Sequence, residues 1–366
     1  MKLKSKIIIF LILCYVWGFS QNAPKYSNEF LSIGVGGRAF AMGNSVIASA
    51  KDISGVYWNP ALLTGLDKQM EIGGMHAEYF AGIAKYDFLG VSYRLDDKSV
   101  AGFSMIRFGV DDIPNTLDLI DSDGNIRYDR ISSFSVADYA FLFSYSRLMP
   151  IDGLSIGGNA KVIRRIVGNF ADAWGFGIDA AASYKMKNLY LGVNLRDVFG
   201  TFNAWSFNRE MFEDVFIETG NEIPENGLEI TLPRLLLGSG YKVNLDKNFS
   251  VYPEIGVIVT TDGKRNTLLK SNLFSADPSF GIEFSYNDMI FVRGGINNFQ
   301  QIPEFNNTTS FSWQPNIGLG IKLYGFNLDY AYTDIGNKSI ALYSHIFSLS
   351  YRFDTKNFFK QSESLN

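Results

Sequence analysis

The stretch DAWGFGIDAAASYKM, residues 172–186, divides its side chains between two faces with a period of two. One face is apolar and carries Trp174, Phe176, Ile178, Ala180, Ala182, Tyr184 and Met186. The other is small or polar and carries Ala173, Gly175, Gly177, Asp179, Ala181, Ser183 and Lys185. Because successive side chains of a β-strand point to opposite sides, the stretch predicts a strand with an apolar surrounding on one side only.

The same alternation recurs along the chain and predicts about fourteen strands. They are expected near residues 70–77, 85–95, 98–110, 137–148, 154–167, 172–186, 189–199, 229–243, 249–260, 278–287, 289–299, 311–323, 326–335 and 340–353. Tight connections such as 187–188 and 324–325 alternate with longer ones near 111–136, 200–228, 261–277 and 300–310. An even strand number with short turns at one end and long loops at the other is typical of an outer-membrane β-barrel.

The composition agrees with a barrel in lipid. The chain has 35 Gly, 31 Phe and 19 Tyr, and charged residues make up only 19%, against about 25% in ordinary soluble domains. After the first twenty residues no apolar run reaches the ~18 residues that a spanning helix needs, so a membrane location requires a closed barrel. The alternative is a secreted β-sandwich or propeller, whose polar faces would be richer in charge. A net charge of −4 argues against a nucleic-acid partner.

The first and last residues predict export and a periplasmic tail. Residues 1–20 carry three lysines and then an apolar run, the layout of a cleaved signal peptide. We therefore expect a cell outer-membrane protein with periplasmic termini, a barrel over 69–353 and a polar tail over 354–366. Cys14, the only cysteine, lies within the predicted signal peptide, so the mature chain has no thiol.

The sequence offers little material for catalysis or metal binding. His76 and His345 are expected on the first and last strands, where a pairing of histidine with Ser344 is conceivable, but nothing marks a nucleophile. The loop Asp118–Asp129 resembles a calcium loop, yet it places a leucine first and Arg130 twelfth, where ligands are required. We predict no enzyme activity, no cofactor and no metal site. Charged residues of both signs on the inward face predict a network of ion pairs inside the barrel.

Residues 21–68 do not alternate and predict a compact plug or cap. Within them, FLSIGVGGRAFAMGNSVIASAKDISGVYWNPALLTGL (30–66) is rich in glycine and alanine, which allow close backbone approach. Pro60 disfavours helix at Asn59 and can itself begin a helical turn. The predicted motif residues are Gly34, Gly36, Gly37, Arg38, Gly43, Asp52, Tyr57, Trp58, Asn59 and Pro60.

This motif, followed by about fourteen strands and the near-terminal HIFSLSYRF, resembles the PorV/PorQ family of Bacteroidetes outer-membrane proteins. That family is linked to type IX secretion and is related to the FadL-type fourteen-stranded fatty-acid transporters, which also carry an N-terminal plug. The stretch IGVGGRAFAMG (33–43) is closer to the general family pattern than to the PorV form, so the resemblance points to a PorV-like paralogue.

The resemblance implies a protein without enzyme activity that binds the sorting domain of secreted cargo, or translocon and attachment proteins, and helps deliver cargo to the cell surface. The long loops would then supply partner-binding aromatics, namely Phe202, Trp205, Phe207, Phe212 and Phe216. The same aromatics could instead fold the loops over the barrel mouth. The alternative function is a FadL-like transporter of hydrophobic small molecules, for which a continuous apolar pocket and a strand kink are expected.

Overall fold

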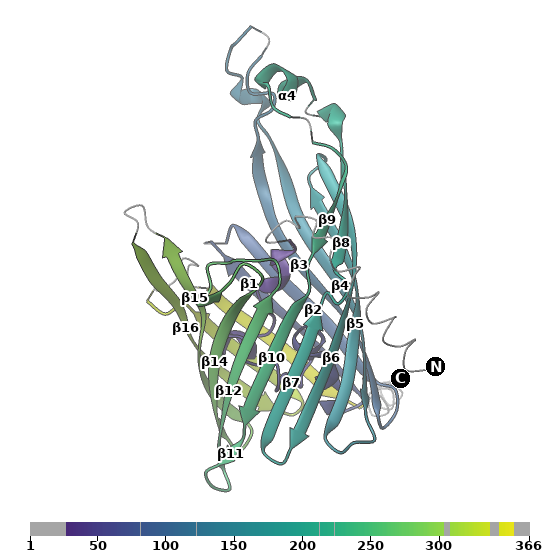
Figure 1. Cartoon of the computed structure of the whole chain (residues 1–366), viewed down its shortest axis with the longest axis vertical. Helices are drawn as coiled ribbons and strands as arrows, with labels where there is room; N and C mark the ends of the chain where they lie inside the picture. The colour runs from purple at the N-terminus through teal and green to yellow at the C-terminus, as the bar shows by residue number, and fades with distance from the viewer. Residues whose placement is uncertain are drawn as a thin grey trace, which may run out of the picture.

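The computed structural model of the chain is a closed antiparallel β-barrel of fourteen barrel strands (Figure 1). We call each complete barrel strand a stave, because some of them consist of more than one strand segment. The structure describes residues 27–80, 82–121, 123–211, 213–222, 224–303, 308–336 and 344–354. The first stave pairs with the last, with Met70 opposite Phe353 and Ala77 opposite Ile346, so the sheet has no free edge. Closure satisfies the backbone groups that an open sheet would leave unpaired in lipid.

Eighteen strand segments form the fourteen staves. They are β1 (Met70–Tyr79), β2 (Ala84–Arg94), β3 (Ser99–Asn115), β4 (Ser132–Leu148), β5 (Leu154–Val167), β6 (Ala171–Met186), β7 (Leu189–Arg196), β8 (Thr201–Phe207), β9 (Gly227–Thr231), β10 (Arg234–Tyr241), β11 (Val243–Asn244), β12 (Phe249–Thr260), β13 (Leu269–Lys270), β14 (Ser275–Tyr286), β15 (Ile290–Pro303), β16 (Thr309–Leu323), β17 (Phe326–Thr333) and β18 (Ser344–Phe353).

Interruptions within the staves explain why eighteen strand segments form only fourteen staves. Segments β7 and β8 both pair with β6 and form one stave, and β9, β10 and β11 form the next. The two-residue β13 is an addition beside β14. The predicted all-β barrel of about fourteen strands is therefore confirmed, and each predicted strand has its observed counterpart.

Two predicted loops contain more regular structure than expected. Strands β3 and β4 extend to Asn115 and from Ser132, so much of the predicted 111–136 loop is a paired ribbon with Tyr128–Arg130 as a 3₁₀ turn (η3) near its tip. The predicted 200–228 loop begins with β8 and contains η4 (Arg209–Met211) and α4 (Glu213–Thr219). Both segments rise beyond the barrel rim on the same side in Figure 1. Neighbouring strands provide hydrogen-bond partners for the backbone groups of these segments, which the prediction of loops did not take into account.

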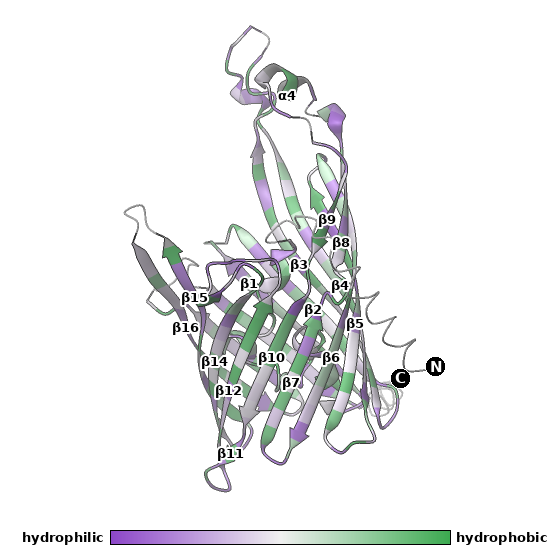
Figure 2. Cartoon of the chain, in the orientation of Figure 1, coloured by the Kyte–Doolittle hydropathy of each residue, from purple (hydrophilic) through white to green (hydrophobic). Residues whose placement is uncertain are grey.

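Large apolar side chains cover the outside of the barrel. Among the exposed ones are Phe143, Trp174, Phe176, Ile255, Phe280, Leu319 and Leu349, from strands all around the sheet. Figure 2 shows the corresponding hydrophobic bands along the strands. Such a surface is unfavourable in water and suits a lipid bilayer, so the barrel spans a membrane. Within the described ranges, no helix is long and apolar enough to cross a membrane.

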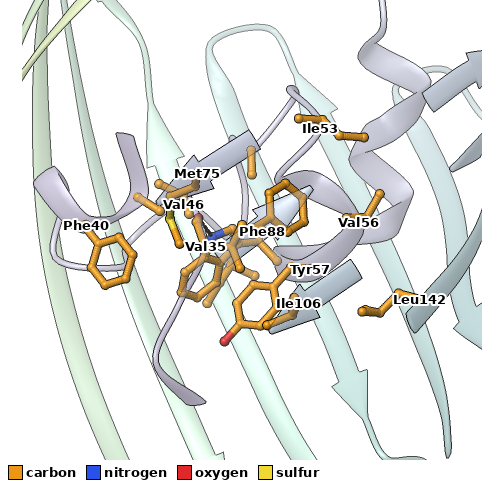
Figure 3. Close-up of a cluster of buried hydrophobic side chains, with 14 of the residues drawn as sticks. Val35, Phe40, Val46, Ile53, Val56, Tyr57, Met75, Phe88, Ile106 and Leu142 are labelled. Atoms are coloured by element: carbon orange, nitrogen blue, oxygen red, sulfur yellow. Dashed lines mark hydrogen bonds between the residues drawn. The ribbon is translucent and has the colours of Figure 1, made fainter. Parts of the chain in front are cut away.

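Residues 27–66, which we call the plug, lie inside the barrel. The plug contains η1 (Glu29–Ser32), α2 (Gly37–Ala41), α3 (Gly55–Trp58) and η2 (Pro60–Gly65). Its apolar side chains form one core with inward residues of strands around the barrel, β1 to β5, β10, β12, β17 and β18; Figure 3 shows Val56 and Tyr57 beside Ile106 and Leu142. The lumen is therefore occupied by protein.

The predicted signal peptide, residues 1–20, and residues 355–366 of the predicted tail lie outside the described residues. The first described residues, Ser27 and Asn28, are buried inside the barrel, where both contact the Thr231 hydroxyl at the end of β9. The periplasmic location of the two termini stays a prediction.

Candidate functional site

The sequence Tyr57-Trp58-Asn59-Pro60 forms the rigid centre of the plug. The Trp58 indole N–H donates to the carbonyl of Val35 at 2.7 Å, and the Tyr57 hydroxyl donates to Leu31 at 2.7 Å. The two rings meet edge to face, 4.9 Å between centroids. Trp58 is 1% exposed, so its ring is held inside the plug, where it ties α3 to the chain near Val35. Such edge-to-face pairs are favourable beyond the area that they bury.

Asn59 and Pro60 determine the direction in which the chain leaves this centre. Asn59 is extended and caps η2, since its side-chain oxygen accepts from the backbone N–H of Ala61, and Pro60 occupies the first position of that turn. The Asn59 amide also donates to the carbonyls of Ile47 (3.0 Å) and Ala182 (3.1 Å). The one side chain therefore links two parts of the plug and strand β6.

The glycines of the motif allow backbone contact between plug and wall. Gly34, Gly36 and Gly43 have positive φ angles, which other residues rarely adopt. A Cβ on Gly43 would lie 2.7 Å from the backbone of Ile296, and one on Gly37 would lie 2.9 Å from the carbonyl of Asp329.

Glycines of the wall face the plug in the same way. A Cβ on Gly192 would lie 2.2 Å from the carbonyl oxygen of Ile47, and one on Gly295 would lie 2.1 Å from both Met42 and Gly43 backbone atoms. Gly157, Gly238 and Gly281 meet plug backbone at under 3.0 Å as well. The plug and the wall therefore pack backbone against backbone, because glycines on both of them lack side chains.

Polar side chains of the wall complete the plug's backbone hydrogen bonds. Asn159 donates to Val56 at 2.9 Å, Asn194 donates to Trp58 at 2.9 Å, and Arg196 donates to Tyr57 at 2.7 Å. Glu254 accepts from the N–H of Ala48 at 2.7 Å. A buried carbonyl or N–H without a partner is costly, so these side chains stabilise the plug inside the lumen.

Arg38 connects the plug to a chain of charges on the wall. Its guanidinium lies 2.8 Å from Glu283 of β14, which also lies 2.6 Å from Arg293 of β15. Arg293 in turn lies 2.6 Å from Asp329 of β17. The carboxylate partner holds the pKa of Arg38 above its ordinary value in spite of burial. Asp52, the remaining motif residue, accepts from the backbone N–H of Ser54 at 2.9 Å and orders the turn before α3.

Lys51 is a plug residue whose charged form is disfavoured by its surroundings. Burial, together with the nearby cations Lys185, Arg38 and Lys242, lowers its pKa to about 8. Its ammonium lies 4.6 Å from the centre of the Tyr190 ring, a favourable cation–π contact. The folded protein therefore binds this proton less tightly than the unfolded chain does.

A pH dependence follows from Lys51. Because its folded pKa is below its unfolded value, the neutral form favours folding, and this stability is present above about pH 10.5 and is lost as pH falls through about 8. We expect the melting temperature of the wild type to rise from pH 8 to 10 relative to Lys51→Met, whose own profile lacks this rise. Thermal unfolding of both proteins at pH 7, 8, 9 and 10 checks it, and parallel profiles would contradict it.

The barrel wall is interrupted between β7 and β8. Six residues, 196–201, stand opposite three residues of β6, and Asp197 and Gly200 adopt positive φ angles. On the inner side of this bulge, the buried ammonium of Lys161 lies 2.8 Å from Asp179 and 2.5 Å from Asp197. The neighbouring stave also breaks here, between Thr231 and Arg234. Bulges of this kind bend a strand and often stand beside functional sites.

A cavity of about 340 Å³ lies between the plug and the wall, toward the end of the barrel that carries the long loops. Its plug side is formed by Glu29, Ser32, Tyr57 and Trp58. Arg234 and Arg265 both approach Glu29, at 2.8 and 3.0 Å, and so fix the plug's first turn beside it. Two further enclosed spaces, next to Asp52 and next to Lys161, hold only about 20 Å³ each.

The predicted partner-binding aromatics that the structure describes lie on two different elements, and their role in partner binding stays a prediction. Phe202, Trp205 and Phe207 belong to β8, and the strand's alternation separates them: Phe202 is exposed, whereas Trp205 and Phe207 stack and Trp205 donates to Glu229. Phe216 lies on α4. Phe212 lies outside the described residues.

The histidine and calcium-loop candidates from the sequence also have structural roles. His76 contacts Asp87 and His345 contacts the Tyr330 hydroxyl, so neither pairs with Ser344. Asp121 accepts from the N–H groups of Asp123 and Asn125 and closes the turn that had resembled a calcium loop. In the described part of the chain, no three His, Cys, Asp or Glu side chains converge as metal ligands would.

Sequence reasoning missed the wall residues that hold the plug. Asn159, Asn194, Gly192 and Gly295 all fall on the inward face by alternation. The alternation therefore predicts that these residues face inward, but the sequence does not show which plug atoms each of them contacts.

Comparisons with known proteins place the fold. No protein-family model and no curated protein matches the sequence. Among solved structures, the CymD monoaromatic hydrocarbon channel matches 88% of this chain and 98% of its own, at 14% identity and a TM-score of 0.55. The Pseudomonas putida toluene transporter TodX matches 88% and 99% at 13% identity, with a TM-score of 0.52. A Pseudomonas aeruginosa FadL homologue matches 87% and 98% at 12% identity, with a TM-score of 0.50.

These likenesses define the class of fold: a closed, FadL-like β-barrel of fourteen strands. They do not support the PorV/PorQ resemblance specifically, which stays a prediction.

Proposed function

We propose that this protein is an outer-membrane channel or transporter for small hydrophobic or amphipathic molecules. The observation that carries the proposal is a plugged, membrane-spanning barrel with a 340 Å³ cavity at its long-loop end. A plug prevents free diffusion of ions and nutrients, so such a barrel passes only a ligand that binds first. The solved barrels of similar fold described above include a hydrocarbon channel and a toluene transporter.

The interruption between β7 and β8 supports the same proposal. It places a bent section of wall, with exposed Phe199 outside and the Lys161 cluster inside, close to the cavity residues Arg196 and Arg234. A ligand that occupied the cavity would lie near the section where residues 196–201 depart from the regular ladder.

The test has an electrical part and an uptake part. In planar bilayers we expect the wild type to show no steady ion conductance, because the plug fills the lumen. Cells that carry the gene should take up at least one of three labelled probes, toluene, decanoate and hexyl glucoside, faster than cells without it, and sucrose uptake should not change. A steady open-pore conductance, or equal uptake of all three probes with and without the gene, would refute the proposal.

A second candidate is the type IX adaptor that the sequence motif suggests. It is favoured by the ribbon of β3 and β4 and the β8–α4 segment, which extend beyond the rim and expose apolar side chains including Ile120, Tyr128 and Ile217. Exposed apolar side chains of this kind occur at protein interfaces.

Comparing secreted and surface proteomes with and without the gene tests the adaptor function. If proteins with type IX sorting domains leave the cell and attach normally in the deletion strain, the adaptor function is wrong. If their export fails while uptake of toluene, decanoate and hexyl glucoside is unchanged, the transporter function is wrong instead.

A further inference from the structure

The cavity above the plug is polar, which a hydrocarbon would not fill favourably. Its wall includes Thr260, Asn266, Thr267, Ser275, Asn298 and Gln300 beside the charged groups. An occupant without polar atoms would remove water from these groups and leave them unpaired, at roughly 1–3 kcal/mol for each buried group that loses its partner. The cavity therefore requires a ligand that makes hydrogen bonds.

The charges around the cavity cancel, which disfavours a charged ligand. Arg234 and Arg265 are engaged by Glu29, and Arg265 also pairs with Asp262. Arg196 is engaged by the carbonyls of Leu31 and Tyr57. These three arginines stand against Glu29, Asp262 and Asp277, so neither a cation nor an anion meets an excess of opposite charge.

Asp277 is a carboxylate that the protein leaves partly unpaired. This residue of β14 lines the cavity, and the backbone of Phe299 supplies one hydrogen bond to its carboxylate, whereas its Oδ1 atom is buried with no hydrogen-bond partner in the described structure. It takes part in none of the ion pairs among the described residues. An unpaired carboxylate oxygen calls for an N–H or O–H donor, and the balance of charge favours a neutral one.

We propose that the cavity binds a neutral, polyhydroxylated group, such as a sugar or a sugar head group, with Asp277 as its anchoring acceptor. The volume holds about eleven waters at ~30 Å³ each, which is the size of one sugar ring with its hydroxyls. Leu236 and Ile258 on the same wall provide an apolar surface for an attached chain. The proposal rests on the proposed function and narrows its substrate to an amphiphile with such a head.

Binding to the protein in nanodiscs tests the site. The probes are glucose, hexyl glucoside, hexanoate and toluene, each measured by calorimetry against wild type, Asp277→Leu and Asp138→Asn. Asp138 is the matched control, because it is an inward carboxylate that pairs with Arg165 and does not line the cavity. We expect hexyl glucoside to bind, glucose to bind more weakly, and Asp277→Leu to weaken both by about tenfold or more, as for an interaction of about 1.4 kcal/mol.

The outcomes separate the two proposals. If hexanoate or toluene binds more tightly than hexyl glucoside, or if Asp138→Asn weakens glucoside binding as much as Asp277→Leu does, the polyhydroxyl site is wrong. Equal binding of glucose and hexyl glucoside assigns the site to free sugars and overturns the amphiphile part. Glucoside binding without any uptake in cells would leave the site standing and overturn the transport function.

Discussion

Gly295→Ala will destabilise the barrel by about 3 kcal/mol or more and will slow its assembly. A Cβ at this position of β15 would lie 2.1 Å from backbone atoms of Met42 and Gly43, which no rotation of a side chain can relieve. Overpacking a tight interior by a methylene typically costs about 1–3 kcal/mol, and a clash with backbone lies at the upper end of that range. Urea unfolding in lipid vesicles, followed by tryptophan fluorescence, measures the change.

The adjacent glycine provides the control. Gly294 belongs to the same strand but points outward, and a Cβ there would have nothing closer than 3.9 Å. We expect Gly294→Ala to unfold like the wild type. Equal destabilisation by the two alanines would show that the strand, and not plug contact, requires glycine. No effect of either would show that the plug does not pack against β15 as described.

Glu283→Ala will have the second large effect, a loss of about 3–5 kcal/mol. The substitution removes the carboxylate that lies between Arg38 of the plug and Arg293 of the wall, at 2.8 and 2.6 Å. Both guanidinium groups are then left buried, with only Asp329 remaining as a partner of Arg293. The same urea unfolding experiment measures this loss, and limited proteolysis will report a looser plug.

A double variant tests the cause. If the cost comes from an uncompensated charge, Glu283→Ala combined with Arg38→Ala will lose less than the sum of the single losses. Asp111→Asn, which removes a half-exposed carboxylate near Lys85, should leave the unfolding curve unchanged. Strictly additive losses would show that Arg38 and Glu283 do not act as a pair in the folded protein.

The sequence predicted the barrel well because alternation is a local property. Lipid outside and a small or polar interior impose the same period of two on every stave, as in residues 172–186, so each strand can be recognised without knowing its neighbours. The alternation also placed Asp179 on the small or polar face of residues 172–186, and the structure buries it inside the barrel. The tight turn at 324–325, where Tyr324 and Gly325 both have positive φ, was recognisable from its glycine.

The site was less predictable because its parts are far apart in the sequence. The motif around Trp58 marked the plug, but its partners Asn159, Asn194 and Arg196 became visible only once the wall surrounded it. The aromatics from Phe202 to Phe216 were grouped by composition alone, and the pairing of β8 with β6 and β9 then separated them. The cavity beside Asp277 has no signature in any single segment.

By itself, therefore, the sequence determined the class of this protein: a fourteen-strand membrane barrel with a glycine-rich segment ahead of it, because solvent on each face dictates residue type strand by strand. Only the tertiary structure decided that this segment is bonded into the lumen, that Arg38, Glu283 and Arg293 form one chain of charges, and that a polar cavity remains above the plug. Those features depend on contacts between segments far apart in the sequence, such as Asn159 with Val56, 103 positions apart, and Arg38 with Glu283, 245 apart, and no local pattern encodes them.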